Sequence, residues 1–180
     1  MQYSIIRSSR KTVSLQITPE GKVLVRCPNR MAKREIDRFV QSKADWIEAH
    51  LQKIAERPAM PRLTETELKA LAGQARELLP RLVREFAPRV GVTYSRITIR
   101  CQRTRWGSCS APGNLNFNCL LMLAPPEVQA YVVVHELCHR KEMNHSPRFW
   151  QEVERVMPDY RTHKKWLKDN GNALMARLPE

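Results

Sequence analysis

The strongest constraint on this fold is a pair of histidines set four residues apart inside an apolar run. His135 and His139 belong to the stretch VVVHELCH, and Pro125-Pro126-Glu127 ahead of it has the proline and early acid of a helix start. The pattern predicts one helix to about Lys141. Residues four apart on a helix differ by about 40° in direction and about 6 Å in height, so both imidazoles can reach one ion at about 2.0–2.1 Å.

Glu136 and His145 complete the predicted centre. Glu136 is about 100° round the helix from His135, where its carboxylate can take a proton from a metal-bound water. Catalytic zinc usually has three protein ligands and a water, and His145, six residues after His139, supplies the third ligand. We therefore predict one Zn²⁺ per chain, held by His135, His139 and His145, with Glu136 as the catalytic general base.

The chain around His145 has the features of a turn between two helices. Asn144 tolerates left-handed backbone and is placed to turn the chain, and Ser146-Pro147 then restarts a helix. An acidic third ligand further along, Glu152 or Glu154, is the alternative. Oxyanion stabilisation needs another donor or charge. The sequence offers four candidates for it without choosing among them: Arg105, Tyr131, Tyr160 and His163.

The segment RTRWGSC at residues 103–109 lies between two predicted strands. Its glycine permits close approach of another backbone, so an extended peptide could add a strand along this edge. We predict that Arg105, Trp106 and Gly107 contact the substrate. The alternative is an ordinary turn that contains a packed tryptophan.

The first 57 residues form a predicted N-terminal unit. Residues 3–27 are predicted to be a β-hairpin, because apolar residues alternate with polar ones at 13–17 and at 23–27, on either side of Pro19-Glu20-Gly21-Lys22. From about residue 33 to Ile54 the apolar spacing is helical, so one helix is expected over the open face. Pro58-Ala59-Met60-Pro61 is the expected linker.

Residues 63–180 form the predicted catalytic domain. Thr64-Glu65-Thr66-Glu67 has the form of a capping box, and the long helix that it opens is expected to end at Gly91. Strands are expected at 97–101 and 115–121, before the helix of the motif. The apolar face of the long helix is expected to comprise Leu68, Leu71, Ala75, Leu78, Leu82 and Phe86.

Composition restricts partners and location without defining the chemistry. The formal charge of +13 favours nucleic acid, anionic substrates or acidic peptides as partners, although a basic surface that is merely solvated explains it as well. The five cysteines are odd in number and contain no CxxC pair, so neither a disulfide framework nor a cysteine zinc site is expected. No membrane span or secretory signal is recognisable, which predicts a soluble, cytoplasmic protein.

Three motifs together give a resemblance to a known family. With RTRWGSC at 103–109, HELCH at 135–139 and NHSPRFW at 144–150, the chain resembles the YgjP-like metallopeptidases, relatives of the WLM and SprT-like proteins. The resemblance implies an α+β fold: a compact zincin-like domain with a small sheet over the HExxH helix, preceded by the hairpin and helix unit. It also implies zinc ligation by the three histidines and catalysis by Glu136. The spacing equals that of metzincins, but Glu142 replaces their glycine.

The leading functional hypothesis is a zinc metallopeptidase that attacks an amide carbonyl of a peptide or protein. A metal-dependent nucleotide pyrophosphatase or phosphohydrolase is one alternative, because the same ion lies among many arginines. A DNA-binding, DNA-dependent protease of the SprT-like kind is another, and a purely structural zinc site is the last. The sequence assigns no oligomeric state.

Overall fold

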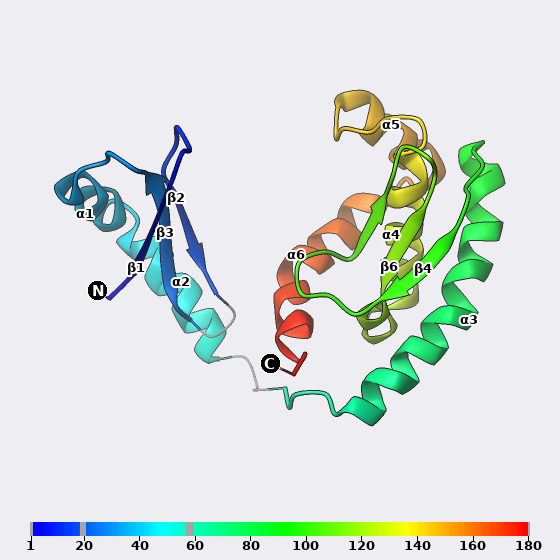
Figure 1. The fold of residues 1–180 in the computed structure, drawn as a ribbon, viewed down its shortest axis with the longest axis horizontal. Helices are drawn as coiled ribbons and strands as arrows, with labels where there is room; N and C mark the ends of the chain where they lie inside the picture. The colour runs from blue at the N-terminus through cyan, green and yellow to red at the C-terminus, as the bar shows by residue number, and fades with distance from the viewer. Residues whose placement is uncertain (1, 19–20, 57–59, 180) are drawn as a thin grey trace. The chain divides into compact units, whose positions relative to one another are not determined.

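The computed structural model describes residues 2–18, 21–56 and 60–179, which group into two compact units, Met1–Met60 and Pro61–Glu180 (Figure 1). Helices and a small sheet occur in each unit, so the chain is an α+β protein. The domain limits 1–57 and 63–180 stay a prediction, as does the zincin-like character of the larger unit. Each unit is described by itself.

The first unit contains the predicted hairpin and one further strand. Strand β2 (Ser14–Ile17) pairs antiparallel with β3 (Val23–Pro28), and Gly21 in the turn between them has φ +78°. Pro19 and Glu20 of the predicted turn lie outside the described residues. Strand β1 (Ser4–Ser8), within the predicted β region, adds parallel to β3, so the order is β1-β3-β2.

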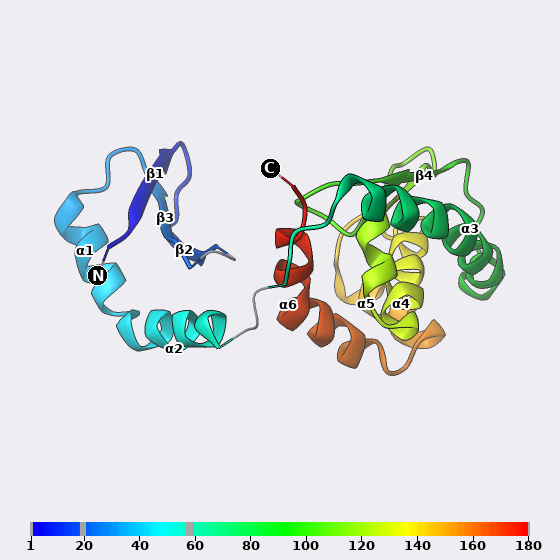
Figure 2. The ribbon, with the colours of Figure 1, turned by 90° about the horizontal axis from the view of Figure 1, so that it is seen from below.

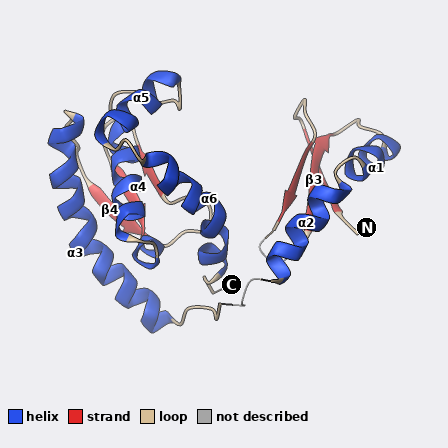
Figure 3. Cartoon of the chain, turned by 180° about the vertical axis from the view of Figure 1, so that it is seen from behind, coloured by secondary structure: helices blue, strands red, loops and turns tan. Residues whose placement is uncertain are grey.

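Two helices cover one face of this sheet, where a single helix was expected. Helix α1 (Lys33–Gln41) ends at Ser42, whose backbone N–H donates to the Arg38 carbonyl, and α2 (Ala44–Ala55) starts after Lys43. Seen from behind, α2 lies in front of the strands (Figure 3). The prediction of one continuous helix was wrong because the chain breaks at Ser42-Lys43. The core comprises Val23, Val25, Cys27, Ile36, Val40 and Ile47.

Helix α3 (Glu65–Val90) opens the second unit with the predicted capping box. The Thr64 hydroxyl accepts a hydrogen bond from the Glu67 backbone N–H at 3.2 Å, and the Glu67 carboxylate accepts one from the Thr64 backbone N–H at 2.7 Å. Pro58 and Ala59 of the predicted linker lie outside the described residues.

The far end of α3 is also as predicted, and only its buried face differs. Gly91 ends the helix with φ +80°, in the left-handed region. Leu79 and Val83 are fully buried, whereas Leu78 and Leu82, the expected core positions, are only partly buried. The apolar face is therefore rotated by one residue in this part of the helix.

Three short strands make the sheet of the second unit. Strand β4 (Ile97–Arg100) is parallel to β6 (Leu115–Asn118), and β5 (Gly107–Cys109) pairs antiparallel with the other side of β6. Strand β5 falls in the expected connection. The second expected strand was too long, because residues 119–123 form a 3₁₀ helix (η1, Cys119–Leu123).

Helix α4 (Pro126–Cys138) carries the histidine motif beneath this sheet (Figures 2 and 3). It packs against α3, α5 (Pro147–Val156) and α6 (Tyr160–Ala176), and most of its residues from Val128 to Cys138 are buried, as expected for an enclosed helix. Its end differs from the prediction, since the helix stops at Cys138 and His139 is the C-cap instead of continuing to Lys141. Within the described residues, no helix is long and apolar enough to cross a membrane.

Candidate metal centre

The three predicted histidines meet at one point. One ligand atom from each of His135, His139 and His145 can be chosen so that all lie within 4.8 Å of one another. The Nε2 atoms of His135 and His145 are 3.0 Å apart. The last turn of α4 and its C-cap present the first two rings, and the loop before α5 brings the third to them from ten residues away.

The arrangement fits a zinc ion. Two nitrogens bound to one tetrahedral zinc at about 2.0–2.1 Å are about 3.3 Å apart, close to the observed separation. Burial, followed by the neighbouring His139 and His145, lowers the pKa of His135 to about 3, and burial also lowers the pKa of His139. Neutral imidazole is the form that binds metal. His135 and His139 therefore favour the form that binds a cation.

The Nδ1 atoms of His139 and His135 differ in their hydrogen bonding. The Nδ1 atom of His139 lies 3.0 Å from the Glu142 carbonyl, the type of outer contact that fixes a ligand ring and leaves Nε2 for the metal. The Nδ1 atom of His135 is buried and has no hydrogen-bond partner among the described residues.

Phe149 and Trp150 support the histidine rings, a role that the sequence analysis missed. The Phe149 ring is fully buried, and its centroid lies 4.9, 4.5 and 4.9 Å from those of His135, His139 and His145. Trp150 stacks on His145 at 5.6 Å. Both residues stand in the motif NHSPRFW, so their place after His145 was the available signal.

Lys164 is a second residue that the sequence analysis missed. Its ammonium lies 3.7 Å from the centroid of the Trp150 ring, a cation–π contact, and its charge contributes to the lowered pKa of His135. No motif surrounds this lysine in the sequence. Only the packing of α6 against α4 brings it near the centre.

The turn that carries His145 forms without left-handed backbone. Among the described residues other than glycine none has a positive φ, so the expectation for Asn144 was wrong. Its carbonyl instead accepts a hydrogen bond from the Ser146 N–H at 2.8 Å. Ser146 caps α5 by accepting from the Phe149 N–H at 3.3 Å, and Pro147 takes the first position, as predicted.

No described contact joins the alternative acidic ligands, Glu152 and Glu154, to the histidines. Glu152 pairs with Lys141 at 2.9 Å and with Arg155 at 3.0 Å, and Glu154 pairs with Arg161. These exposed ion pairs are ordinary surface contacts.

Glu136 is buried beside strand β5. Its side chain is 5% exposed, and a Cβ atom built on Gly107 would lie 2.6 Å from its Oε1 atom. No larger residue fits at this position without moving the carboxylate. Burial raises the pKa of Glu136 to about 8, and the positive charge of Arg105 acts in the opposite direction.

The three predicted substrate-binding residues have different surroundings. Gly107 lies against Glu136, and the exposed Arg105 is the charged residue that acts on the same carboxyl. Trp106 is partly buried, and its indole packs against α6, where a Cβ on Gly171 would be 3.1 Å from Nε1. This position matches the alternative of a packed tryptophan. Contact of all three with substrate stays a prediction.

Three of the four candidates for oxyanion stabilisation lie together, since the Tyr131 ring is 6.5 Å from that of Tyr160 and 6.4 Å from that of His163. The Tyr131 ring lies 5.9 Å from His135, and Tyr160 stacks on Trp150 at 5.4 Å. His163 lies 3.1 Å from a carboxylate oxygen of Asp159. These contacts do not favour one candidate over Arg105, so the choice stays open.

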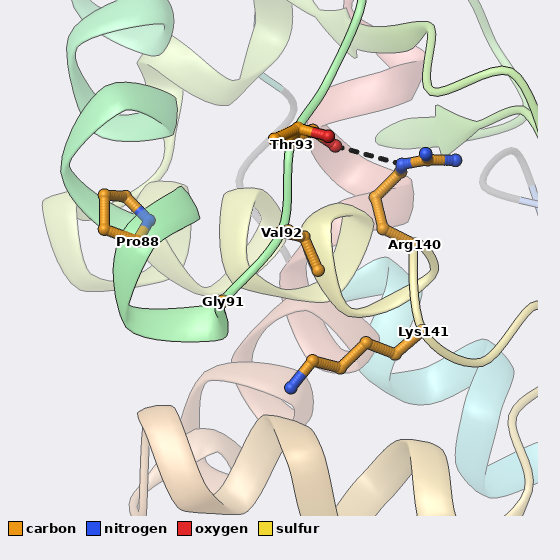
Figure 4. Close-up of a pocket in the computed structure, with 6 residues that line it drawn as sticks. All are labelled: Pro88, Gly91, Val92, Thr93, Arg140 and Lys141. Atoms are coloured by element: carbon orange, nitrogen blue, oxygen red, sulfur yellow. Dashed lines mark hydrogen bonds between the residues drawn. The ribbon is translucent and has the colours of Figure 1, made fainter.

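A pocket of about 580 Å³ lies next to the end of α4, and none of the metal-site residues lines it (Figure 4). Arg140 stands at its wall and donates hydrogen bonds to the carbonyls of Thr93 at 3.0 Å and Ala111 at 2.5 Å. Lys141, on the same wall, pairs with Glu152. Arg140 and Lys141, which line the pocket, therefore hold the chain in place directly after His139.

Comparison with known proteins identifies a family. The family described as YgjP-like, metallopeptidase domain, matches residues 11–74 and 62–170. The crystal structure of the metallopeptidase zymogen of Pyrococcus abyssi abylysin is 22% identical, with a TM-score of 0.46 over 51% of this chain and 93% of its own. The corresponding zymogen of Methanocaldococcus jannaschii jannalysin is 23% identical, with a TM-score of 0.43 over 50% and 91%. No curated protein matches the sequence.

Proposed function

The chain belongs to the YgjP-like metallopeptidase family, and from that premise we propose that it is a zinc-dependent peptidase with its metal on His135, His139 and His145. The observation that carries the proposal is the convergence of three imidazoles on one point, two of them with pKa values lowered by burial. Glu136, the residue after the first ligand, supplies a carboxylate at the same helix end.

The chemistry is divided between the ion and the chain. When bound, zinc would polarise the carbonyl under attack and lower the pKa of a water molecule from about 15.7 towards about 7. The carboxylate of Glu136 accepts the proton of the attacking water and donates it to the nitrogen of the leaving amine. Phe149, packed on all three imidazole rings, closes one side of the centre to solvent.

Strand β5 is the proposed binding edge for the peptide. It is an outer strand, since the sheet order is β4-β6-β5, and its first residue touches Glu136. An extended peptide that pairs with a free strand edge gains main-chain hydrogen bonds irrespective of its sequence. Such pairing would hold a scissile bond near Glu136, with Arg105 beside it.

We also propose that the protein acts in the cytoplasm. All five cysteines are free thiols, which suits a reducing compartment.

The test compares the purified wild type with Glu136→Gln on casein and on a mixture of unstructured peptides, at equal zinc content. The control is Glu127→Gln, which removes an exposed carboxylate from the first turn of the same helix. We expect cleavage by the wild type and by Glu127→Gln, and a loss of at least about 100-fold in Glu136→Gln. Nucleoside triphosphates are assayed in parallel. Phosphate release without peptide cleavage would reverse the assignment in favour of a phosphohydrolase.

A further inference from the structure

Asn118 is a completely buried polar residue at the end of β6. Its Oδ1 atom accepts a hydrogen bond from the Leu120 N–H at 3.1 Å. Its Nδ2 atom donates to the carbonyls of Gln102 at 2.6 Å and Arg105 at 3.0 Å. A side-chain amide has two N–H donors and one carbonyl acceptor, so each of these groups is engaged.

These contacts fasten the connection between β4 and β5. The backbone N–H of Asn118 also donates to the Trp106 carbonyl at 2.8 Å, so one residue binds the segment 102–106 at three carbonyls. The segment has no regular secondary structure, and its residues 103–105 are exposed. Exposed segments with few internal contacts are usually mobile. The Asn118 amide restrains the backbone of this one, while its Trp106 side chain packs against α6 and its Arg103 side chain donates to the Pro179 carbonyl.

The segment leads directly to the groups that surround Glu136. It ends at Gly107, where a Cβ would come within 2.6–2.8 Å of three atoms of the Glu136 side chain. A shift of the segment would therefore move the backbone that lies against that carboxylate.

We propose that Asn118 is a positioning residue, which holds segment 102–106 so that Gly107 keeps the Glu136 carboxylate in place for proton transfer. The kinetic part of this inference rests on the proposed function of Glu136 as the base. Asn118 itself touches no reacting group in this account. Its effect reaches the chemistry through the segment that it holds.

The test uses Asn118→Ser in the full chain. Serine can still cap η1, but its side chain is too short to reach the carbonyls of Gln102 and Arg105. Asn118→Asp is the second variant, because it keeps the shape and the acceptor for Leu120 while it lacks both donors. The matched control is Gln129→Met, which removes another buried amide whose Nε2 donates to the Ala124 carbonyl at 2.8 Å.

The first readout is the backbone order parameter of residues 102–106 by ¹⁵N relaxation, which needs no activity. We expect about 0.85 in the wild type and in Gln129→Met, and below about 0.6 in either Asn118 variant, with the remaining chain unchanged. A segment that stays rigid in both Asn118 variants would overturn the proposal. This readout decides the matter even if the wild type cleaves no peptide, a result that would refute the proposed function alone.

The second readout is a double-mutant cycle in kcat/KM, measured well below the melting temperature at equal zinc content. Asn118→Ser should lower kcat/KM by about tenfold through misplacement of the reacting groups, and Gln129→Met by less than about twofold. With Gly107→Ala already present, Asn118→Ser should cost about threefold or less, because the contact that the segment positions against Glu136 is already altered. A full tenfold loss in that background would show that Asn118 does not act through the segment.

Discussion

Gly107 lies so close to the Glu136 carboxylate that no larger residue fits there without moving it. It is the first residue of β5 and lies against Glu136, with space for hydrogen only. The proposed chemistry requires a carboxylate in a fixed place, and a displacement of about 1 Å can cost about 100-fold in rate. A single methyl group at this position is therefore a direct probe of that requirement.

Gly107→Ala should lower kcat/KM by about 100-fold while zinc binding is retained, because the added methyl pushes the Glu136 side chain and leaves the three imidazoles untouched. Steady-state kinetics and metal analysis measure the two effects. Gly73→Ala is the control, since a Cβ there meets no atom within 4 Å. Activity of Gly107→Ala equal to that of Gly73→Ala would refute the placement of Glu136.

His145→Ala should weaken zinc binding by more than about 100-fold, since two imidazoles from α4 remain and even outer-shell changes cost about 10–100-fold in affinity. Competition with a chromogenic chelator measures the affinity. His50→Ala, in the first unit, should bind zinc as the wild type does. Retention of full affinity in His145→Ala would remove that histidine from the ligand set.

At the scale of elements, helix ends explain much of what was predictable. The capping box at Thr64 and the glycine at position 91 each have a local physical cause, and both ends of α3 were predicted correctly. The Ser146-Pro147 start of α5 has a similar cause. Signals of this kind depend on a few neighbouring residues, so the sequence alone contains them.

Tertiary contacts explain what the sequence did not show. The strand at 115–121 stops at Asn118 because that side chain accepts from the Leu120 N–H and bonds to distant carbonyls. Phe149 was recognisable as an apolar helix residue, but its contact with three imidazoles depends on how α5 meets α4. The histidine cluster itself was predictable, because two of its members are one helical turn apart.

Gly91→Ala should destabilise the protein by about 1–2 kcal/mol, the cost of left-handed backbone for a residue with a Cβ. A Cβ at Gly91 would meet only Lys141 Nζ at 3.9 Å, an ordinary contact, so backbone strain is the whole effect. Urea denaturation measures it. Gly73→Ala, inside the same helix, should instead stabilise by about 0.5–1 kcal/mol. Equal effects of the two variants would contradict the role of Gly91.

At the scale of the whole molecule, the three histidines of the candidate metal centre all lie in the second unit. No described residue of the first unit belongs to the histidine cluster. The basic residues behind the net charge of +13 occur in both units, and a nucleic-acid partner stays a prediction.

A fragment of residues 61–180 should therefore bind zinc within about threefold of the affinity of the full chain, because all three ligands and Phe149 belong to it. Isothermal titration with zinc measures both proteins. A fragment that folds, as judged by its circular dichroism, but binds zinc more than about 100-fold more weakly would show that the first unit helps to form the centre.

The most direct test of the central claim is X-ray absorption at the zinc edge of the full-length protein. We expect one zinc per chain with three imidazole nitrogens at about 2.0–2.1 Å and one further light ligand. The chain also has five free cysteines, and a zinc bound by cysteine would show sulfur ligands instead. Sulfur at about 2.3 Å, or a centre without three imidazoles, would contradict the assignment of His135, His139 and His145.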